Sequence, residues 1–168
     1  MRTTLALMAL MAQTAQTALM ALMALMASIA APAAAADAPY NEPADAKADI
    51  RATLAAAQQA KLPVLVVFGA NWCGDCRMLD TAFKTGASAA LMAKSFKIVK
   101  VDVGRFDRNV DIATGYGVPL KSGIPAVAVL AADGRLLYAT AGGELADARK
   151  MGDTGVLDFF AKVAAKHR

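Results

Sequence analysis

Apolar residues in this chain recur at two spacings, one typical of amphipathic helices and one typical of buried strands. Residues 44–61, ADAKADIRATLAAAQQAK, place Ile50, Leu54 and Ala57 on one face at helical spacing. A Lys-Leu-Pro triplet ends this segment, and residues 64–70, VLVVFGA, follow as a short, continuously apolar and β-branched run. The pattern predicts a helix and then a strand that is covered on both faces.

The same alternation continues through the middle of the chain. A second helix is expected to begin at CGDC and to bury Met78, Leu79 and Phe83, with Gly86 interrupting it. KIVKVDV then reads as a second apolar strand, and DRNVDIATGYG as a helix that ends at glycine. A strand, a helix and a strand in succession predict a parallel pair of strands joined by a right-handed crossover.

The last third of the chain changes to an antiparallel pattern. AVAVLAADGRLLYAT contains two short apolar runs separated by Asp133-Gly134, which is a strong hairpin signal. The closing segment, GDTGVLDFFAKVAAK, is expected to form a helix with Asp153 or Thr154 as its cap. The order of these elements predicts an α/β fold in which a central mixed sheet of about four strands is flanked by helices.

The first 36 residues have the composition of a secretory signal peptide. A basic start is followed by an almost uncharged run of Ala, Leu and Met, and small residues stand at Ala34 and Ala36. Cleavage after Ala36 would leave a flexible lead-in over 37–43 and a single domain over 44–168. The protein is therefore expected to be periplasmic or secreted.

The competing interpretation is an uncleaved membrane anchor. The apolar segment from Ala18 to Ala36 approaches the roughly 20 residues that a spanning helix needs. Ser28 and Pro32 interrupt this segment, and no basic cluster follows it. Cleavage is therefore the preferred interpretation.

Charge excludes one class of partner. The net charge of the chain is only +4, and its basic residues are interspersed among acidic ones. A nucleic-acid-binding protein normally concentrates Lys and Arg in a patch or stripe. No nucleic-acid partner is expected.

The two cysteines of the chain, Cys73 and Cys76, both lie in NWCGDCRML, directly after the first predicted strand. A structural disulfide stabilises most when it closes a long loop, and this pair closes almost none. At a helix start, unpaired N–H groups and the helix dipole stabilise a thiolate on Cys73, while Cys76 lies on the same face and is less exposed. The spacing suits an attacking thiol, Cys73, and a resolving thiol, Cys76, that exchange disulfides through a mixed disulfide.

FGANWCGDCRML, the later KVDV and the GIPAVAVL that precedes the hairpin together resemble the thioredoxin superfamily, over about residues 60–168. The resemblance implies the thioredoxin fold and a thiol–disulfide oxidoreductase of the bacterial cell envelope, acting as a reductase. It implies no cofactor beyond the redox-active Cys73–Cys76 disulfide. The implied partners are protein thiol or disulfide substrates and a membrane thiol-electron donor.

The resemblance also implies roles for residues around the pair. A cis peptide bond is expected at Ile124-Pro125, with Pro125 beside the cysteines, and Pro119 is the competing proline. Trp72 is expected to cover the active site; the alternative is an ordinary buried aromatic. Lys100 matches a family lysine below the cysteines, where its ammonium could favour a thiolate; the alternative is a solvated strand charge.

Two positions depart from the family pattern. Thioredoxins carry a buried acidic residue six positions before the first cysteine, implied to accept a proton from the resolving thiol, and Val67 stands there in this chain. Between the cysteines, Gly74 and Asp75 stand where Gly-Pro is commonest. The carboxylate of Asp75 disfavours a neighbouring thiolate, which predicts a reducing pair, although the charge of Arg77 acts in the opposite direction.

Two other functions compete with this interpretation. A structural zinc site needs about four ligands, and the chain offers the two thiols and His167, so no metal is expected. The non-enzymatic alternative is a thioredoxin-fold binding module or holdase in which the cysteines stay idle. Val67 favours a binding module, whereas the intact cysteine pair with Trp72 and Pro125 around it favours an enzyme.

Overall fold

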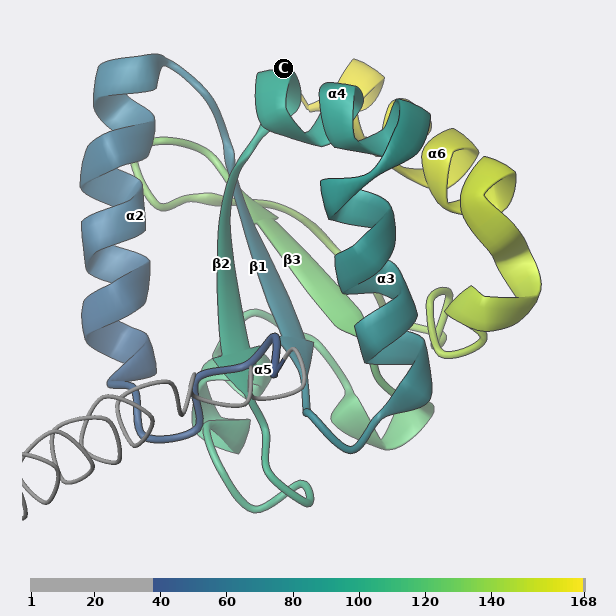
Figure 1. Ribbon diagram of the computed structural model, residues 1–168. Helices are drawn as coiled ribbons and strands as arrows, with labels where there is room; N and C mark the ends of the chain where they lie inside the picture. The colour runs from purple at the N-terminus through teal and green to yellow at the C-terminus, as the bar shows by residue number, and fades with distance from the viewer. Residues whose placement is uncertain (1–37, 168) are drawn as a thin grey trace, which may run out of the picture. The chain divides into compact units, whose positions relative to one another are not determined.

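A four-stranded mixed sheet lies at the centre of the domain, as Figure 1 shows. The computed structural model describes residues 38–167. The strands are β1 (Val64–Gly69), β2 (Lys97–Asp102), β3 (Ala126–Leu130) and β4 (Leu136–Ala139), in the spatial order β2-β1-β3-β4. Strands β1 and β2 run parallel, and β3 is antiparallel to both β1 and β4. The predicted parallel pair and the predicted hairpin are both confirmed.

Strand β1 occupies the middle of this sheet and is buried along its whole length. Side chains of a strand point alternately to its two faces. Val64, Val66 and Phe68 join the apolar cluster on one side, and Leu65 and Val67 join the cluster on the other. The continuously apolar run therefore marks a strand covered on both faces, as predicted.

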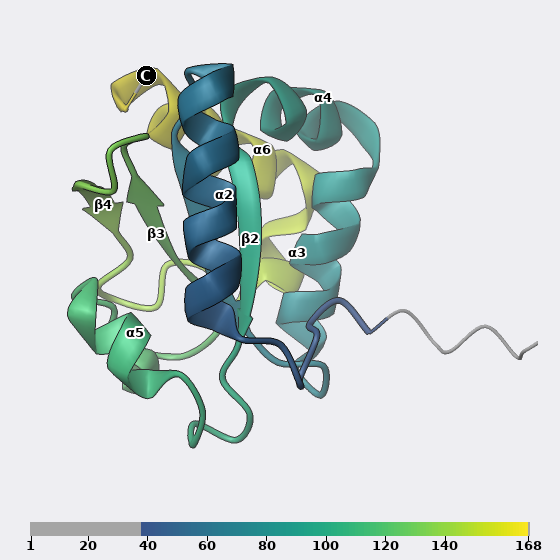
Figure 2. The same cartoon turned by 90° about the vertical axis from the view of Figure 1, so that its left-hand side faces the viewer.

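Helices cover both faces of the sheet (Figure 2). Helices α2 (Ala46–Ala60) and α5 (Val110–Gly115) contribute to the first apolar cluster. Helices α3 (Gly74–Lys84), α4 (Gly86–Ser95) and α6 (Ala148–Lys166) contribute to the second. The predicted α/β architecture is confirmed, and the turn from β1 into α3 places the cysteine pair at one end of the sheet.

Helix α6 begins earlier than predicted. The sequence pattern predicts a start at Asp153 or Thr154, whereas the helix runs from Ala148 and contains a non-helical residue, Gly152, with φ 62° and ψ −179°. Gly152 separates a first helical turn from the longer remainder of α6. Leu145 and Ala148 are fully buried, so apolar contacts hold this first turn against the domain.

In the described part of the predicted lead-in, residues 38–43, one side chain packs against the domain. Tyr40 in this segment is only 2% exposed and belongs to the core on the α2 side. Its aromatic ring provides the apolar area that holds the segment in place. The predicted signal peptide over 1–36 lies outside the described residues. Within residues 38–167, no helix has the length and apolar character to cross a membrane.

Candidate active site

Cys73 and Cys76 lie where β1 passes into α3, and a disulfide joins them. Cys73 is the N-cap residue of α3, and its Sγ accepts a hydrogen bond from the Cys76 N–H at 3.1 Å. The free N–H groups and the dipole of the helix start favour negative charge on this sulfur. Cys73 is 6% exposed and Cys76 is fully buried, so a substrate can reach Cys73 first.

The loop before β3 places a peptide carbonyl beside Sγ of Cys73. The Ile124-Pro125 peptide bond is cis, and no other cis peptide bond occurs among the described residues. The competing assignment to Pro119 is therefore excluded. Sγ of Cys73 lies 3.6 Å from the carbonyl oxygen of Ile124. The main chain before Pro125 therefore borders the atom at which exchange would occur.

Trp72 lies at the rim of the site and is 47% exposed, so the alternative of an ordinary buried aromatic does not hold. Its indole Nε1 donates a hydrogen bond to the Gly104 carbonyl at 2.8 Å. The ring of Phe106 packs edge-on against it, with the ring centroids 6.0 Å apart, and the Arg105 guanidinium lies 5.8 Å from the indole centroid. These contacts fix the indole beside Cys73 without burying it.

Below the cysteines, Lys100 forms an ion pair with Asp80, so it is not simply a solvated strand charge. Lys100 stands opposite Val67 in the register of β1 and β2. Asp80 follows Cys76 by one turn on the same side of α3, and it is only 5% exposed. The carboxylate that is absent at Val67 is thus present in the same region, supplied by a helix instead of a strand.

The environment of Asp80 keeps it ionised. Burial alone would raise its pKa, but hydrogen bonds and charge from Lys100 and Lys84 outweigh burial and hold the pKa below its usual value. A cavity of about 530 Å³, lined by Asp49, Asp80 and Lys100 among others, lies against this carboxylate. No sequence pattern singled out Asp80; the available signal was an acidic residue four positions after Cys76 on a helix face that is otherwise apolar.

Asp75, between the cysteines, is not an isolated anion. One carboxylate oxygen accepts a hydrogen bond from the Arg149 backbone N–H at 2.9 Å, and the other accepts one from the Arg149 guanidinium at 3.1 Å. Burial would raise the pKa of Asp75, but these contacts outweigh it and lower the pKa. The expectation that Asp75 opposes a thiolate took no account of Arg149, which lies 74 positions away in the sequence.

The lead-in supports the loop that carries the cysteines. The Tyr40 N–H donates to Oδ1 of Asn71 at 2.9 Å, and Nδ2 of Asn71 donates to the Tyr40 carbonyl at 2.8 Å. The Tyr40 ring occupies the space beside Gly69, where an added Cβ would overlap its hydroxyl and lie 3.0 Å from Sγ of Cys76. Glycine at this position therefore lets the lead-in reach the underside of the site.

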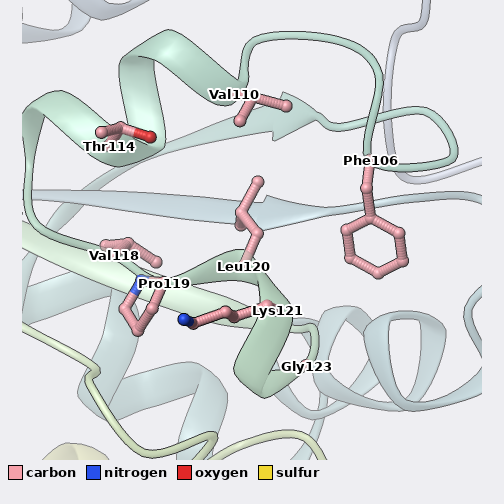
Figure 3. A pocket seen from close by; sticks show the side chains of 8 residues that line it. All are labelled: Phe106, Val110, Thr114, Val118, Pro119, Leu120, Lys121 and Gly123. Carbon is pink, nitrogen blue, oxygen red and sulfur yellow. The ribbon is translucent and has the colours of Figure 1, made fainter.

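An apolar groove of about 510 Å³ begins near the rim of the site. Figure 3 shows Val110 from α5 and Leu120 from the short 3₁₀ helix η2 (Leu120–Ser122) pointing into the same space, with Phe106 at one end. Phe106 contacts Trp72, and Gly123, which also lines the groove, directly precedes the Ile124-Pro125 bond. Two of the residues that line the groove, Phe106 and Gly123, thus connect it to the surroundings of Cys73.

Metal ligation has no support in this region. In the part of the chain from Ala38 to His167, no three His, Cys, Asp or Glu side chains gather as a metal site would require. The chemistry that the site can perform is carried by the two sulfurs, the helix start and the charged groups of Asp75, Asp80, Lys100 and Arg149.

Comparisons of this chain with a family model and with known sequences indicate the same family. A family model described as Thioredoxin-like matches residues 45–132. Thioredoxin 1 from Chlorobaculum tepidum is 37% identical over 87 residues, which cover 49% of this chain and 73% of that protein. A thioredoxin from Porphyra purpurea is 44% identical over 57 residues, which cover 34% of this chain and about half, 49%, of that relative.

Comparison with solved structures finds a closer match. The crystal structure of a disulphide isomerase from Xylella fastidiosa Temecula1 is 52% identical in sequence and has a TM-score of 0.74. The match covers 77% of this chain and 98% of that chain. The similarity therefore extends over essentially the whole of that domain, well beyond the segment around the cysteines.

Proposed function

The chain belongs to the thioredoxin-like family, and from this premise we propose that it is a thiol–disulfide oxidoreductase of the bacterial cell envelope that reduces protein disulfides. The observation that carries the proposal is the unequal placement of the two sulfurs. Cys73 is the N-cap of α3 and lies beside the Ile124 carbonyl, whereas Cys76 is fully buried. Cys73 can therefore react with the substrate first, and Cys76 can then resolve the mixed disulfide.

The reaction proceeds in two exchanges. The Cys73 thiolate attacks one sulfur of a substrate disulfide; the substrate S–S bond breaks, and the leaving sulfur departs as a thiolate that takes up a proton. The Cys76 thiolate then attacks Sγ of Cys73, closes the Cys73–Cys76 disulfide and releases the second substrate thiol. Two electrons pass from the cysteine pair to the substrate. A membrane thiol-electron donor is the proposed source of the electrons that reduce the pair again.

Deprotonation of Cys76 is assigned to Asp80. Its carboxylate lies one helical turn from Cys76 and borders a cavity that is lined in part by polar groups. Because Lys100 and Lys84 lower its pKa, the carboxylate holds the proton only transiently and passes it to water. The ion pair with Lys100 holds the carboxylate in this place. Asp80 would therefore take the role that the acidic residue absent at Val67 has in thioredoxins.

The substrate is proposed to be a polypeptide. The apolar groove between α5 and η2 is continuous with the rim formed by Trp72 and Phe106, and it can take an apolar side chain next to the substrate cysteine. The relative from Xylella fastidiosa, a disulphide isomerase at 52% identity, supports action on protein disulfides. Isomerisation and reduction both begin with attack by a reduced Cys73, so the first exchange is common to both.

Export is proposed from the composition of residues 1–36, which matches a cleavable signal peptide. A location outside the cytoplasm also suits a redox pair, because protein disulfides persist there. The N-terminal sequence of the protein isolated from a bacterial envelope fraction tests this proposal. A start at Asp37 is expected, and an intact N-terminus in the membrane fraction would instead favour the uncleaved anchor.

The decisive experiment is an equilibrium redox titration of the purified protein against glutathione or dithiothreitol. Trp72 is the single tryptophan and provides a fluorescence signal next to the pair. A reversible two-electron midpoint below about −230 mV is expected for a reductase, and one above about −180 mV would indicate an oxidase or isomerase instead. The Cys76→Ser variant is the control, because it retains Cys73 but cannot close the disulfide.

The same titration distinguishes the alternative of a binding module or holdase. That alternative was favoured by the apolar residue at Val67, and Asp80 now supplies a carboxylate to the same region. A pair that never cycles between dithiol and disulfide would exclude the enzyme and leave the binding module.

A further inference from the structure

The two residues between the cysteines are tied to a distant helix. Asp75 receives two hydrogen bonds from Arg149, one from its backbone N–H at 2.9 Å and one from its guanidinium at 3.1 Å. Arg149 stands in the first turn of α6, which Gly152 separates from the rest of that helix. Ala148, its neighbour, is fully buried, so the backbone that presents Arg149 is anchored in the core.

The guanidinium lies against the peptide that connects the two cysteines. A Cβ added to Gly74 would be 3.2 Å from the central carbon of the guanidinium and 3.2 Å from one of its nitrogens. A glycine at this position thus permits the cation to approach the backbone between Cys73 and Cys76. The Asp75 side chain is 14% exposed and that of Arg149 is 67% exposed, so the pair lies at the surface around the active site.

Arg149 is the cation that lies against the peptide between the cysteines, because the neighbouring cations contact other groups. Arg77 of α3 donates to the Asn71 carbonyl at 2.9 Å, on the side of the preceding loop. In the first turn of α6, Lys150 pairs with Asp147 at 3.1 Å, and Asp147 also attracts Arg149. Among the charged residues whose contacts the structure describes, only Arg149 contacts Asp75.

We propose that Arg149 is a positioning residue that cancels the charge of Asp75, favours the thiolate of Cys73 and so makes the cysteine pair more oxidising than its Gly-Asp dipeptide would be alone. This rests on the proposed function, because it concerns the exchange that Cys73 starts. An uncompensated carboxylate next to Cys73 would disfavour the thiolate, and a guanidinium held over the same peptide offsets that effect. A stabilised thiolate stabilises the reduced form and raises the reduction potential.

Two conservative substitutions separate charge from structure. Arg149→Gln and Asp75→Asn both break the same ion pair, so a purely structural role predicts effects in the same direction. The electrostatic role predicts opposite effects: Arg149→Gln leaves an anion beside Cys73 and disfavours the thiolate, whereas Asp75→Asn leaves a cation and favours it. The Arg149→Gln/Asp75→Asn double variant should return close to the wild type.

The measurements are the glutathione equilibrium constant of each variant at pH 7 and low salt, and the pH profile of Cys73 alkylation after chemical reduction. Exposed charges change such an equilibrium by roughly threefold. We expect about a threefold decrease in the stability of the reduced form for Arg149→Gln and about a threefold increase for Asp75→Asn, which correspond to ~14 mV downward and upward. The alkylation profile should move to higher pH in the first variant and to lower pH in the second.

Two controls sharpen the result. Lys162→Gln removes an exposed cation of α6 for which the described contacts include neither Asp75 nor Asp147, and it should leave both measurements unchanged. High salt should shrink both shifts, because screening weakens interactions between exposed charges. Shifts of the two single variants in the same direction, or no shift in either, would overturn the role of Arg149.

Failure of the proposed function would look different. A wild-type pair that does not cycle with glutathione would refute the oxidoreductase, yet the alkylation profile of the chemically reduced protein would still report whether Arg149 favours the Cys73 thiolate. A wild-type pair that cycles, with unchanged variants, would refute the role of Arg149 and leave the oxidoreductase standing.

Discussion

At the scale of single residues, the site depends on which charges meet below and beside the two sulfurs. Lys100 could have acted on the cysteines directly, but its ammonium contacts Asp80. The ion pair sets a carboxylate one helical turn from Cys76, in a region that is apolar at Val67. The proposed acceptor for the proton of the buried thiol, Asp80, therefore belongs to α3 and not to β1.

The Asp80→Asn variant should slow the second exchange selectively. Without the carboxylate, the Cys76 thiol loses its proton acceptor, and a mixed disulfide with a substrate peptide should persist roughly tenfold longer or more at neutral pH. Because a free cysteine titrates near about 8.5, the defect should fade as the pH rises above that value. Quenched-flow separation of the mixed disulfide, followed from pH 6 to pH 10, measures its lifetime.

Asp49→Asn is the matched control for this prediction. Asp49 lines the same cavity but is exposed, and the described contacts do not include an ion pair with Lys100. The control should leave the lifetime of the mixed disulfide unchanged. A slow second exchange that is independent of pH would contradict a proton-accepting role and assign Asp80 to the packing of α3 alone.

At the scale of elements, the lead-in is part of the fold. Tyr40→Ala should lower the free energy of unfolding by about 3 kcal/mol, because it removes a buried aromatic ring from the core next to Gly69. Tyr40→Phe keeps the ring and should cost less than about 1 kcal/mol. Urea unfolding of the oxidised protein gives both values. A loss below about 1 kcal/mol for Tyr40→Ala would mean that the lead-in adds little to the fold.

The elements themselves could be predicted from the sequence because each depends on a local pattern. The continuous apolar run of β1, the Asp133-Gly134 turn and the interruption after α3, where α4 begins at Gly86, all correspond to the observed structure. Packing of the lead-in could not be predicted, because a single tyrosine has no periodicity. Its partner, Gly69, reads locally as the end of a strand, and only the folded chain brings the two together.

The charged contacts of the site were unpredictable for a related reason. Asp75 meets Arg149 from another helix, and Asp80 meets Lys100 from a strand. Arg149 and Asp80, taken alone, read as solvated surface charges, and the pairings depend on how α6 and β2 lie relative to α3. The reactive cysteines and the cis bond before Pro125 could be predicted, because their motifs are short and contiguous.

At the scale of the whole molecule, two unlike surfaces lie near Cys73. Helix α6, on one face of the sheet, brings Arg149 to Asp75 of α3, whereas α5 and η2 bring an apolar groove (Figures 2 and 3). Phe106 is 44% exposed and Val110 is 39% exposed along that groove. Exposed apolar side chains gathered next to a reactive atom are typical of a surface that binds a partner.

The groove should therefore select substrates by the residue beside their cysteine. Replacing Phe106 or Val110 by Ser removes apolar area that a bound side chain would cover, a loss of about 1 kcal/mol, so KM should rise roughly fivefold for a peptide disulfide flanked by leucine. The KM for oxidised glutathione, which is too small to fill the groove, should stay the same. Leu136→Ser on β4, an equally exposed apolar residue outside the groove, is the control. Equal changes for both substrates would place the effect at Cys73 and would contradict a binding role for the groove.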